Sequence, residues 1–252
     1  MKTPILFLLL ATALTAHAQD FTIKEFKRTH NRIFFEDHAE TITIKFPVIV
    51  TKSAVVNKLI NDKIKEEVLS PEDNKMSLAK ALDTAIGTWM TELEYEVTFR
   101  QNGLLSLKFT VEGEGAYPST SLFYLNFDLR NGQFLTTLDI IAKDRIESFT
   151  RKVFTDKKKF LQDYKSEMKD SIKTNKNDTT DFASAIEIVN ESCIEHVEMK
   201  SFSLTKNELE IIDPCEFPHV MQNMGPDYQL KYSLGYLKEF LKPEYLKRLI
   251  KQ

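Results

Sequence analysis

Three stretches between residues 93 and 129 alternate apolar and polar side chains, a pattern typical of strands that are buried on one face only. The stretches are 93–99, 105–111 and 123–129. Asn102-Gly103 separates the first two and Asn131-Gly132 follows the third, and Asn-Gly is the strongest short-range signal for a hairpin turn. The three stretches therefore predict an antiparallel meander. Its second face carries polar side chains that suit water or a partner rather than a core, namely Glu94, Glu96, Thr98, Lys108, Tyr124, Asn126 and Asp128.

Apolar residues at helical spacing lie on both sides of this meander. One predicted helix begins after Ser53, a favourable N-cap, and a second covers about 73–90. After the meander, helical spacing covers 138–154 and 157–168, and the polar stretch 170–181 is the best loop candidate inside the chain. We therefore predict an α+β fold in which an antiparallel sheet meander packs with helices.

Shorter elements are predicted toward the two ends of the chain. Residues 21–26 and 41–46 alternate and indicate a hairpin, whose second strand should end at Pro47 because proline cannot donate to a strand ladder. The elements predicted near the C-terminus are a hairpin of 199–204 and 208–213, a strand over 228–232, and helices over 236–241 and 243–250.

The first eighteen residues have the pattern of a secretory signal peptide. A positive start, Met1-Lys2-Thr3, precedes an apolar stretch that ends near Thr15, and Ala16-His17-Ala18 supplies the small residues that a signal peptidase recognises. The apolar stretch is shorter than the roughly 20 residues of a transmembrane helix. We predict cleavage between Ala18 and Gln19 and a periplasmic or secreted protein without a membrane span. An N-terminal anchor that stays attached is the alternative.

Export determines how the two cysteines are interpreted. Cys193 and Cys215 both lie in the mature part, and an even number of cysteines in an oxidising compartment favours a disulfide. Such a bridge would close a loop of about 22 residues around the predicted 199–213 hairpin and contribute roughly 3 kcal/mol. Two buried free thiols are the alternative. A metal-binding pair is not expected, because no second pair of Cys or His has ligand spacing.

The charges are nearly balanced, with 34 Lys and Arg against 37 Asp and Glu, which argues against a dedicated nucleic-acid-binding protein. The one basic cluster is expected to be a solvated helix face and consists of Arg151, Lys152, Lys157, Lys158 and Lys159.

Motifs that carry catalysis or cofactor binding are weak in this sequence. No histidines have the i, i+4 spacing of helical zinc ligands, and there is no G-x-S-x-G nucleophile turn. Gly113-Glu114-Gly115 lacks the helix start that would bind a phosphate. We therefore predict no catalytic residue, metal or cofactor. The alternative is an envelope hydrolase that uses exposed carboxylates for acid–base chemistry, from the set Glu92, Glu94, Glu96, Glu112 and Glu114.

Several segments, in a fixed order between about residues 40 and 252, carry a resemblance to a known module. They are Ile44–Ile49, a helix with Asn57 and Ile60-Asn61, the loop Gly113–Pro118, Phe127–Gly132, Leu138–Ile141, Glu208–Ile212, Phe217–His219, Gly225-Pro226 and Tyr232–Leu241. The set resembles the extracellular module of RsiV-type lysozyme-sensing anti-sigma factors. It is also similar to the non-catalytic N-terminal region of PdaC-type peptidoglycan deacetylases. The resemblance implies an N-terminal subdomain over 19–110 and a C-terminal subdomain over 111–252.

The function implied by this resemblance is recognition without catalysis. The chain shows neither the transmembrane segment of an anti-sigma factor nor a deacetylase domain, so it resembles the recognition module alone. Tyr117 replaces the histidine that the common loop pattern carries, so a role of that histidine is not carried over. We expect an exported binding module of the bacterial cell envelope, with lysozyme or a peptidoglycan-related ligand. A structural envelope component without a small ligand is a further alternative.

Two loops are the candidate ligand-binding surface, because loops carry function disproportionately and these two are rich in aromatic and Met side chains. The candidate residues are Glu114, Tyr117 and Pro118 in the first loop and Phe217, His219 and Met221 in the second. The alternative is that the aromatic and Met side chains cap the core. A slight acidic excess would help modestly in attracting basic lysozyme.

Overall fold

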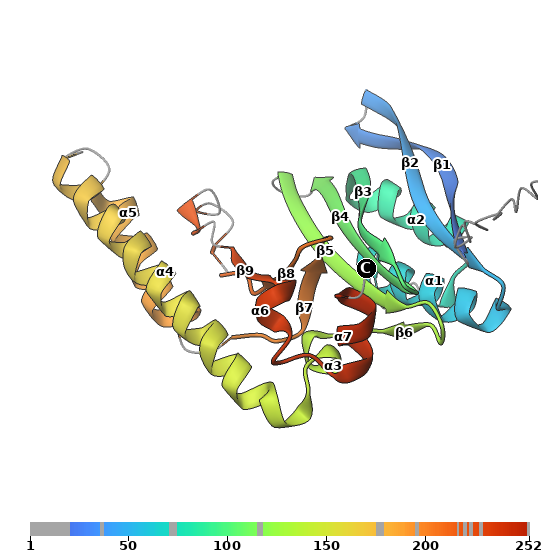
Figure 1. Ribbon diagram of the computed structural model, residues 1–252. Coiled ribbons are helices and arrows are strands. Elements are labelled where there is room, and N and C mark those ends of the chain that lie inside the picture. Colours follow the sequence, from blue (N-terminus) through green and yellow to red (C-terminus); the bar gives the residue numbers. More distant parts are fainter. Residues whose placement is uncertain are drawn as a thin grey trace, which may run out of the picture.

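The computed structural model describes residues 21–35, 38–70, 75–114, 118–174, 179–194, 197–215, 217–218, 221, 224–226 and 229–250. The predicted signal peptide lies outside these residues. Within them the chain forms an α+β fold with antiparallel sheets of two, four and three strands, which confirms the predicted class (Figure 1). The strand orders are β1-β2, β3-β4-β5-β6 and β7-β8-β9.

The strands are β1 (Phe21–Phe35), β2 (His38–Thr51), β3 (Met90–Gln101), β4 (Leu104–Glu114), β5 (Pro118–Asp128), β6 (Gln133–Phe134), β7 (Ser201–Leu204), β8 (Glu208–Ile212) and β9 (Leu230–Ser233). The α-helices are α1 (Ala54–Val68), α2 (Leu78–Thr88), α3 (Thr137–Ile140), α4 (Ile146–Thr174), α5 (Thr179–Ile188), α6 (Leu234–Leu237) and α7 (Pro243–Leu249). A 3₁₀ turn covers 143–145 and a π-helical turn covers 189–193.

The predicted meander is present as β3, β4 and β5. Asn102 and Gly103 connect the first two strands with φ values of +52° and +73°, the left-handed pair that a two-residue hairpin turn requires. The apolar face of the meander packs against α1, α2 and the β1–β2 hairpin in the first hydrophobic cluster. The side chain of Ser53 caps α1 as predicted, whereas α2 begins at the N-cap Ser77, later than the sequence suggested.

The β1–β2 hairpin is longer than predicted. β2 continues through Pro47, which pairs with Glu25, so the predicted strand end is wrong. β1 is the only hydrogen-bonded neighbour of β2 among the described strands. A strand with one neighbour points every second amide away from it, so a residue without an N–H fits at such a position.

The second half of the chain differs more from the prediction. α4 is a single helix of 29 residues, where two helices were predicted, and its end and the start of α5 occupy part of the predicted loop 170–181. No glycine or proline interrupts 146–174, so nothing in the backbone forces a break. The hairpin of β7 and β8 is confirmed, and α6 begins earlier and is shorter than the predicted helix.

The C-terminal sheet covers one end of the meander's polar face. The Asn126 side chain donates to the Phe202 carbonyl over 2.6 Å, and the Leu204 amide donates to Ser106 Oγ over 3.2 Å. Asn126 is therefore buried, and Asp128 is buried as well, which corrects the expectation that their whole face meets water or a partner. A second hydrophobic cluster lies between this sheet, α3, the start of α4, α6 and α7. The predicted subdomain boundary at residues 110 and 111 falls inside β4.

A third, smaller hydrophobic cluster lies where α4 and α5 extend away from the sheets (Figure 1). It contains the disulfide between Cys193 and Cys215, which confirms the predicted bridge. Also on α4, the Lys157 ammonium lies 2.7 Å from an Asp213 carboxylate oxygen, and both side chains are buried. Lys157 thus does not belong to a solvated helix face, because it points inward from the middle of α4.

Candidate functional site

The part of the polar face that the C-terminal sheet leaves open is dominated by carboxylates. Glu92, Glu94 and Glu96 follow one another on β3, and Glu112 lies on the neighbouring strand β4; all four are exposed. We call these four residues the acidic face. Strand register places Glu92 directly opposite Glu112, and Glu96 opposite the half-buried Lys108. Like charges directly opposite one another destabilise a sheet, so the pair Glu92–Glu112 is unfavourable unless a cation approaches it.

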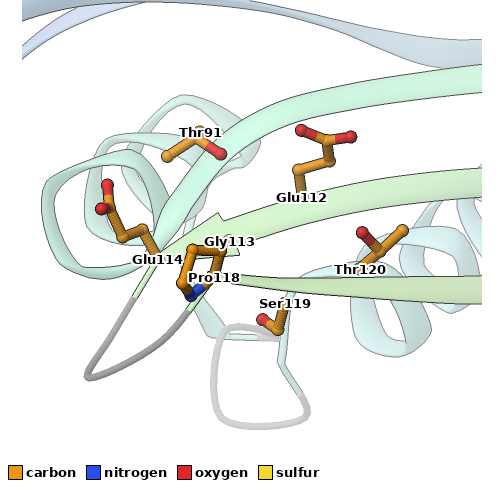
Figure 2. A pocket seen from close by; sticks show the side chains of 7 residues that line it. All are labelled: Thr91, Glu112, Gly113, Glu114, Pro118, Ser119 and Thr120. Carbon is orange, nitrogen blue, oxygen red and sulfur yellow. The ribbon is translucent and has the colours of Figure 1, made fainter. Parts of the chain in front are cut away.

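One hollow, of about 400 Å³, lies beside the acidic face at the end of the β4–β5 hairpin. Figure 2 shows its lining: Thr91 from β3, Glu112, Gly113 and Glu114 from β4, and Pro118, Ser119 and Thr120 from β5. The register pairs Glu112 with Thr120 and Glu114 with Pro118, so two carboxylates and two β5 residues border the same space. The hollow is therefore acidic, and it is open to solvent.

The backbone around this hollow is fixed by close packing. A Cβ on Gly113 would lie 2.7 Å from Cε3 of Trp89, so only glycine lets β4 pass the indole this closely. The Glu114 amide donates to the Trp89 carbonyl over 2.7 Å, and Arg32 Nη2 donates to the Glu114 carbonyl over 2.9 Å. These contacts hold the end of β4, and with it the base of the Glu114 side chain.

A second hollow, of about 440 Å³, lies between β3 and the β1–β2 hairpin. It is lined by Glu25, Thr43, Lys45, Glu92, Leu93, Glu94 and Tyr95. Burial, and then the nearby charge of Glu25, raises the pKa of Tyr95 above its ordinary value. The acidic face thus has a hollow at each side, and each hollow includes carboxylates from β3 or β4.

The described residues of the two loops that the sequence proposed as one ligand-binding surface lie in different surroundings. Glu114 and Pro118 lie together at the first hollow, whereas Phe217 is only 8% exposed and packs with Met221 in the third cluster. Tyr117 and His219 lie outside the described residues. Thr91, Ser119 and Thr120 were missed; the hairpin register, which sets Thr120 opposite Glu112, is the signal that could have found Thr120.

The part of the chain that the structure describes lacks both a metal-binding cluster and a membrane-spanning helix. No group of three or more His, Cys, Asp or Glu side chains there has the geometry to hold a metal ion. None of the helices there combines the length and the apolar character that crossing a bilayer requires.

No family model matches the sequence, and no curated protein matches it significantly. Two solved structures are similar over nearly the whole chain. A DUF3298 family protein from Pseudomonas aeruginosa PAO1 is 16% identical with a TM-score of 0.54, covering 90% of this chain and 97% of that one. A member of the same family from Bacteroides fragilis NCTC 9343 is 16% identical with a TM-score of 0.59, covering 92% and 98%. At this identity the likeness shows the fold, which is that of DUF3298 proteins, a domain of unknown function.

Proposed function

We propose that this chain is an exported, non-catalytic binding module of the bacterial cell envelope, and that its acidic face recognises a basic protein of the lysozyme type. The observation that supports this most directly is the cluster of exposed carboxylates on an open sheet face with an acidic hollow on each side. The resemblance to lysozyme-sensing modules points to the same class of partner. The disulfide is compatible with an oxidising compartment.

Electrostatics favours a basic partner at this face. Bringing a lysine or arginine between Glu92 and Glu112 would replace a repulsion across the two strands by two attractions. Exposed charge pairs contribute roughly 0.2–1 kcal/mol each, so affinity depends on several acting together. Complementary charge also accelerates encounter, an effect that salt screens over about 8 Å at physiological ionic strength.

Binding fits these carboxylates better than hydrolysis does. A general acid at neutral pH needs a carboxyl group whose pKa is raised, usually by burial beside the reacting bond. The four carboxylates of the acidic face are exposed on an open sheet instead. A peptidoglycan fragment could accept or donate hydrogen bonds here, but such contacts would show little dependence on salt.

The test is binding of c-type lysozyme to the full chain exported to the periplasm of an expression host. We expect micromolar or tighter binding by calorimetry that weakens between 50 and about 300 mM salt. The triple variant Glu92→Gln, Glu94→Gln, Glu96→Gln should lose about tenfold in affinity or more, equivalent to about 1.4 kcal/mol.

A matched control removes three exposed glutamates elsewhere: Glu187→Gln on α5, Glu191→Gln on the π turn and Glu239→Gln after α6. It changes the net charge equally, so it should keep nearly full affinity if the acidic face is the binding surface. Equal losses of lysozyme affinity in both triple variants would show that net charge, and not the acidic face, determines binding. If the chain does not bind lysozyme but binds soluble peptidoglycan fragments independently of salt, the partner is a glycan and the proposed protein partner is wrong.

A further inference from the structure

The outer edge of β5 has backbone groups that point away from the sheet. The Leu135 amide donates to the Asn126 carbonyl over 2.8 Å, so the backbone groups of Asn126 face β6 and not β4. In an antiparallel ladder, every second residue directs its N–H and C=O toward the same edge. The register of β4 and β5 has no irregularity, so Thr120 and Leu122 also point their backbone groups outward.

Among the described strands, none pairs with this outer edge at Thr120 and Leu122. β6 pairs only with Phe127 and Asp128, at the far end of β5. Thr120 and Leu122 are exposed, the latter to 51%. Sheet edges are usually protected by a charged residue, a bulge or a proline. The stretch 119–124 contains none of these, and Pro118 stands only at its start.

We propose that β5 accepts an extended segment of a basic partner protein as an added strand, and that a lysine or arginine of this segment reaches across Thr120 to Glu112 and Glu114. In this mode of recognition, backbone hydrogen bonds supply affinity and a pocket for a particular side chain supplies specificity. The inference rests on the proposed function, because it specifies how the basic partner is held.

The dimensions and charges fit this arrangement. Neighbouring strands are about 4.8 Å apart, so β4 lies roughly 10 Å from an added strand, a span that a Lys or Arg and a Glu side chain cover together. Thr120 lies opposite Glu112 and is small enough for the stem of a long side chain to pass over it. The Glu112 and Glu114 carboxylates of the first hollow would then be paired with the cation.

A second copy of this chain is a poorer occupant of the edge. β5 contains no lysine or arginine, so a β5 strand from another copy could not place a cation at the hollow. It would also bring a second acidic hollow onto the same face of the extended sheet. Charge complementarity therefore favours a strand of different sequence, alternating between uncharged and basic side chains.

The probe is a nine-residue peptide of alternating threonine and valine with one central lysine. Two matched peptides isolate the two parts of the proposal: one has glutamate in place of lysine, and the other keeps lysine but has alternate backbone amides N-methylated. Binding of the full chain is measured by fluorescence anisotropy, and amide exchange is followed by NMR. We expect slower exchange at Thr120 and Leu122 with the lysine peptide, at least tenfold weaker binding of the glutamate peptide, and no binding of the methylated peptide.

Two variants of the protein complete the test. Leu122→Pro removes an outward N–H without removing a bond to β4, so it should abolish peptide binding. The double variant Glu112→Gln, Glu114→Gln should reduce the preference for the lysine peptide over the glutamate peptide by about tenfold. This variant keeps the proposal testable if Leu122→Pro does not fold.

Equal binding of the methylated peptide, or unchanged exchange at Thr120 and Leu122, would overturn strand addition. So would a dimer in the ultracentrifuge that Leu122→Pro dissociates, because a second copy would then occupy the edge. Lysozyme binding that survives Leu122→Pro but is lost in the triple acidic-face variant would retain the proposed function and reject this inference alone.

Discussion

At the scale of single residues, one arginine fastens the C-terminal helix to the meander. Arg248 on α7 is buried and forms a two-point ion pair with Asp128, over 2.6 and 3.0 Å. It also donates to the Asn102 carbonyl over 2.9 Å and to the Gly103 carbonyl over 2.7 Å. A single side chain thus donates hydrogen bonds both to the carboxylate at the end of β5 and to the backbone carbonyls of the turn between β3 and β4.

We expect Arg248→Met to lower the free energy of unfolding by about 3 kcal/mol, because it removes the buried cation from the buried Asp128 carboxylate and a donor from two carbonyls. Urea unfolding followed by circular dichroism measures this. The matched control is Arg130→Met, which removes the other cation on Asp128 but from an exposed side chain. It should cost less than about 1 kcal/mol. Equal losses in the two variants would contradict the central role of Arg248.

The same carboxylate makes stability depend on pH. Burial alone would raise the pKa of Asp128, but hydrogen bonds from Arg130 and Arg248 outweigh it and hold this pKa well below the ordinary value. The pKa of Asp128 in the folded protein is therefore lower than its value of about 3.9 in the unfolded chain. The ionised Asp128 carboxylate thus stabilises the fold above about pH 4, and this contribution is lost as the pH falls further. Asp128→Asn should flatten the fall in unfolding free energy between about pH 4 and 2, as measured by urea titrations. An unchanged slope would contradict this assignment.

At the scale of elements, local pattern predicted the strands of the meander and the hairpins well, because alternation and Asn-Gly turns are short-range signals. It failed at the middle of α4. The gap between the two predicted helices falls at Thr155 and Asp156, which are weak helix formers. In the structure, Asp156 pairs with Lys152 on the same helix and accepts a hydrogen bond from the Tyr232 hydroxyl over 2.9 Å. A contact 76 residues away along the chain is not visible in local periodicity.

At the candidate site, too, local pattern could not predict contacts between residues that are distant in the sequence. Glu94 and Asn126 both belong to a polar alternation, and nothing local distinguishes the exposed side chain from the buried one. The difference arises because β7 folds back over one end of the sheet and bonds to Asn126. Glu114 and Pro118 could be placed together because one hairpin joins them. The burial of Phe217 agrees with the alternative that these side chains cap the core, but local pattern could not identify α4 and α5 as the helices against which it packs.

At the scale of the whole molecule, buried side chains of the described residues form three hydrophobic clusters. The third lies apart from the sheets, along α4 and α5 (Figure 1). An ion pair and a disulfide stabilise this third cluster. The buried pair Lys157–Asp213 joins α4 to the end of β8, and the disulfide Cys193–Cys215 joins the end of the π turn to the segment after β8. The acidic face and the β5 edge belong to the part of the molecule built on the first cluster.

This division predicts a local effect of removing the disulfide. The bridge spans 22 residues, and its loss should cost about 3 kcal/mol in the cooperative unit that contains it. We expect the double variant Cys193→Ser, Cys215→Ser to exchange its amide protons faster in α5 and in the C-terminal half of α4, measured by hydrogen exchange with mass spectrometry. Exchange in β3, β4 and β5 should change little, because their core is formed by the first cluster. Lysozyme binding should then persist in this variant, since the acidic face does not depend on the third cluster. Uniformly faster exchange through the meander would show instead that the clusters unfold as one unit.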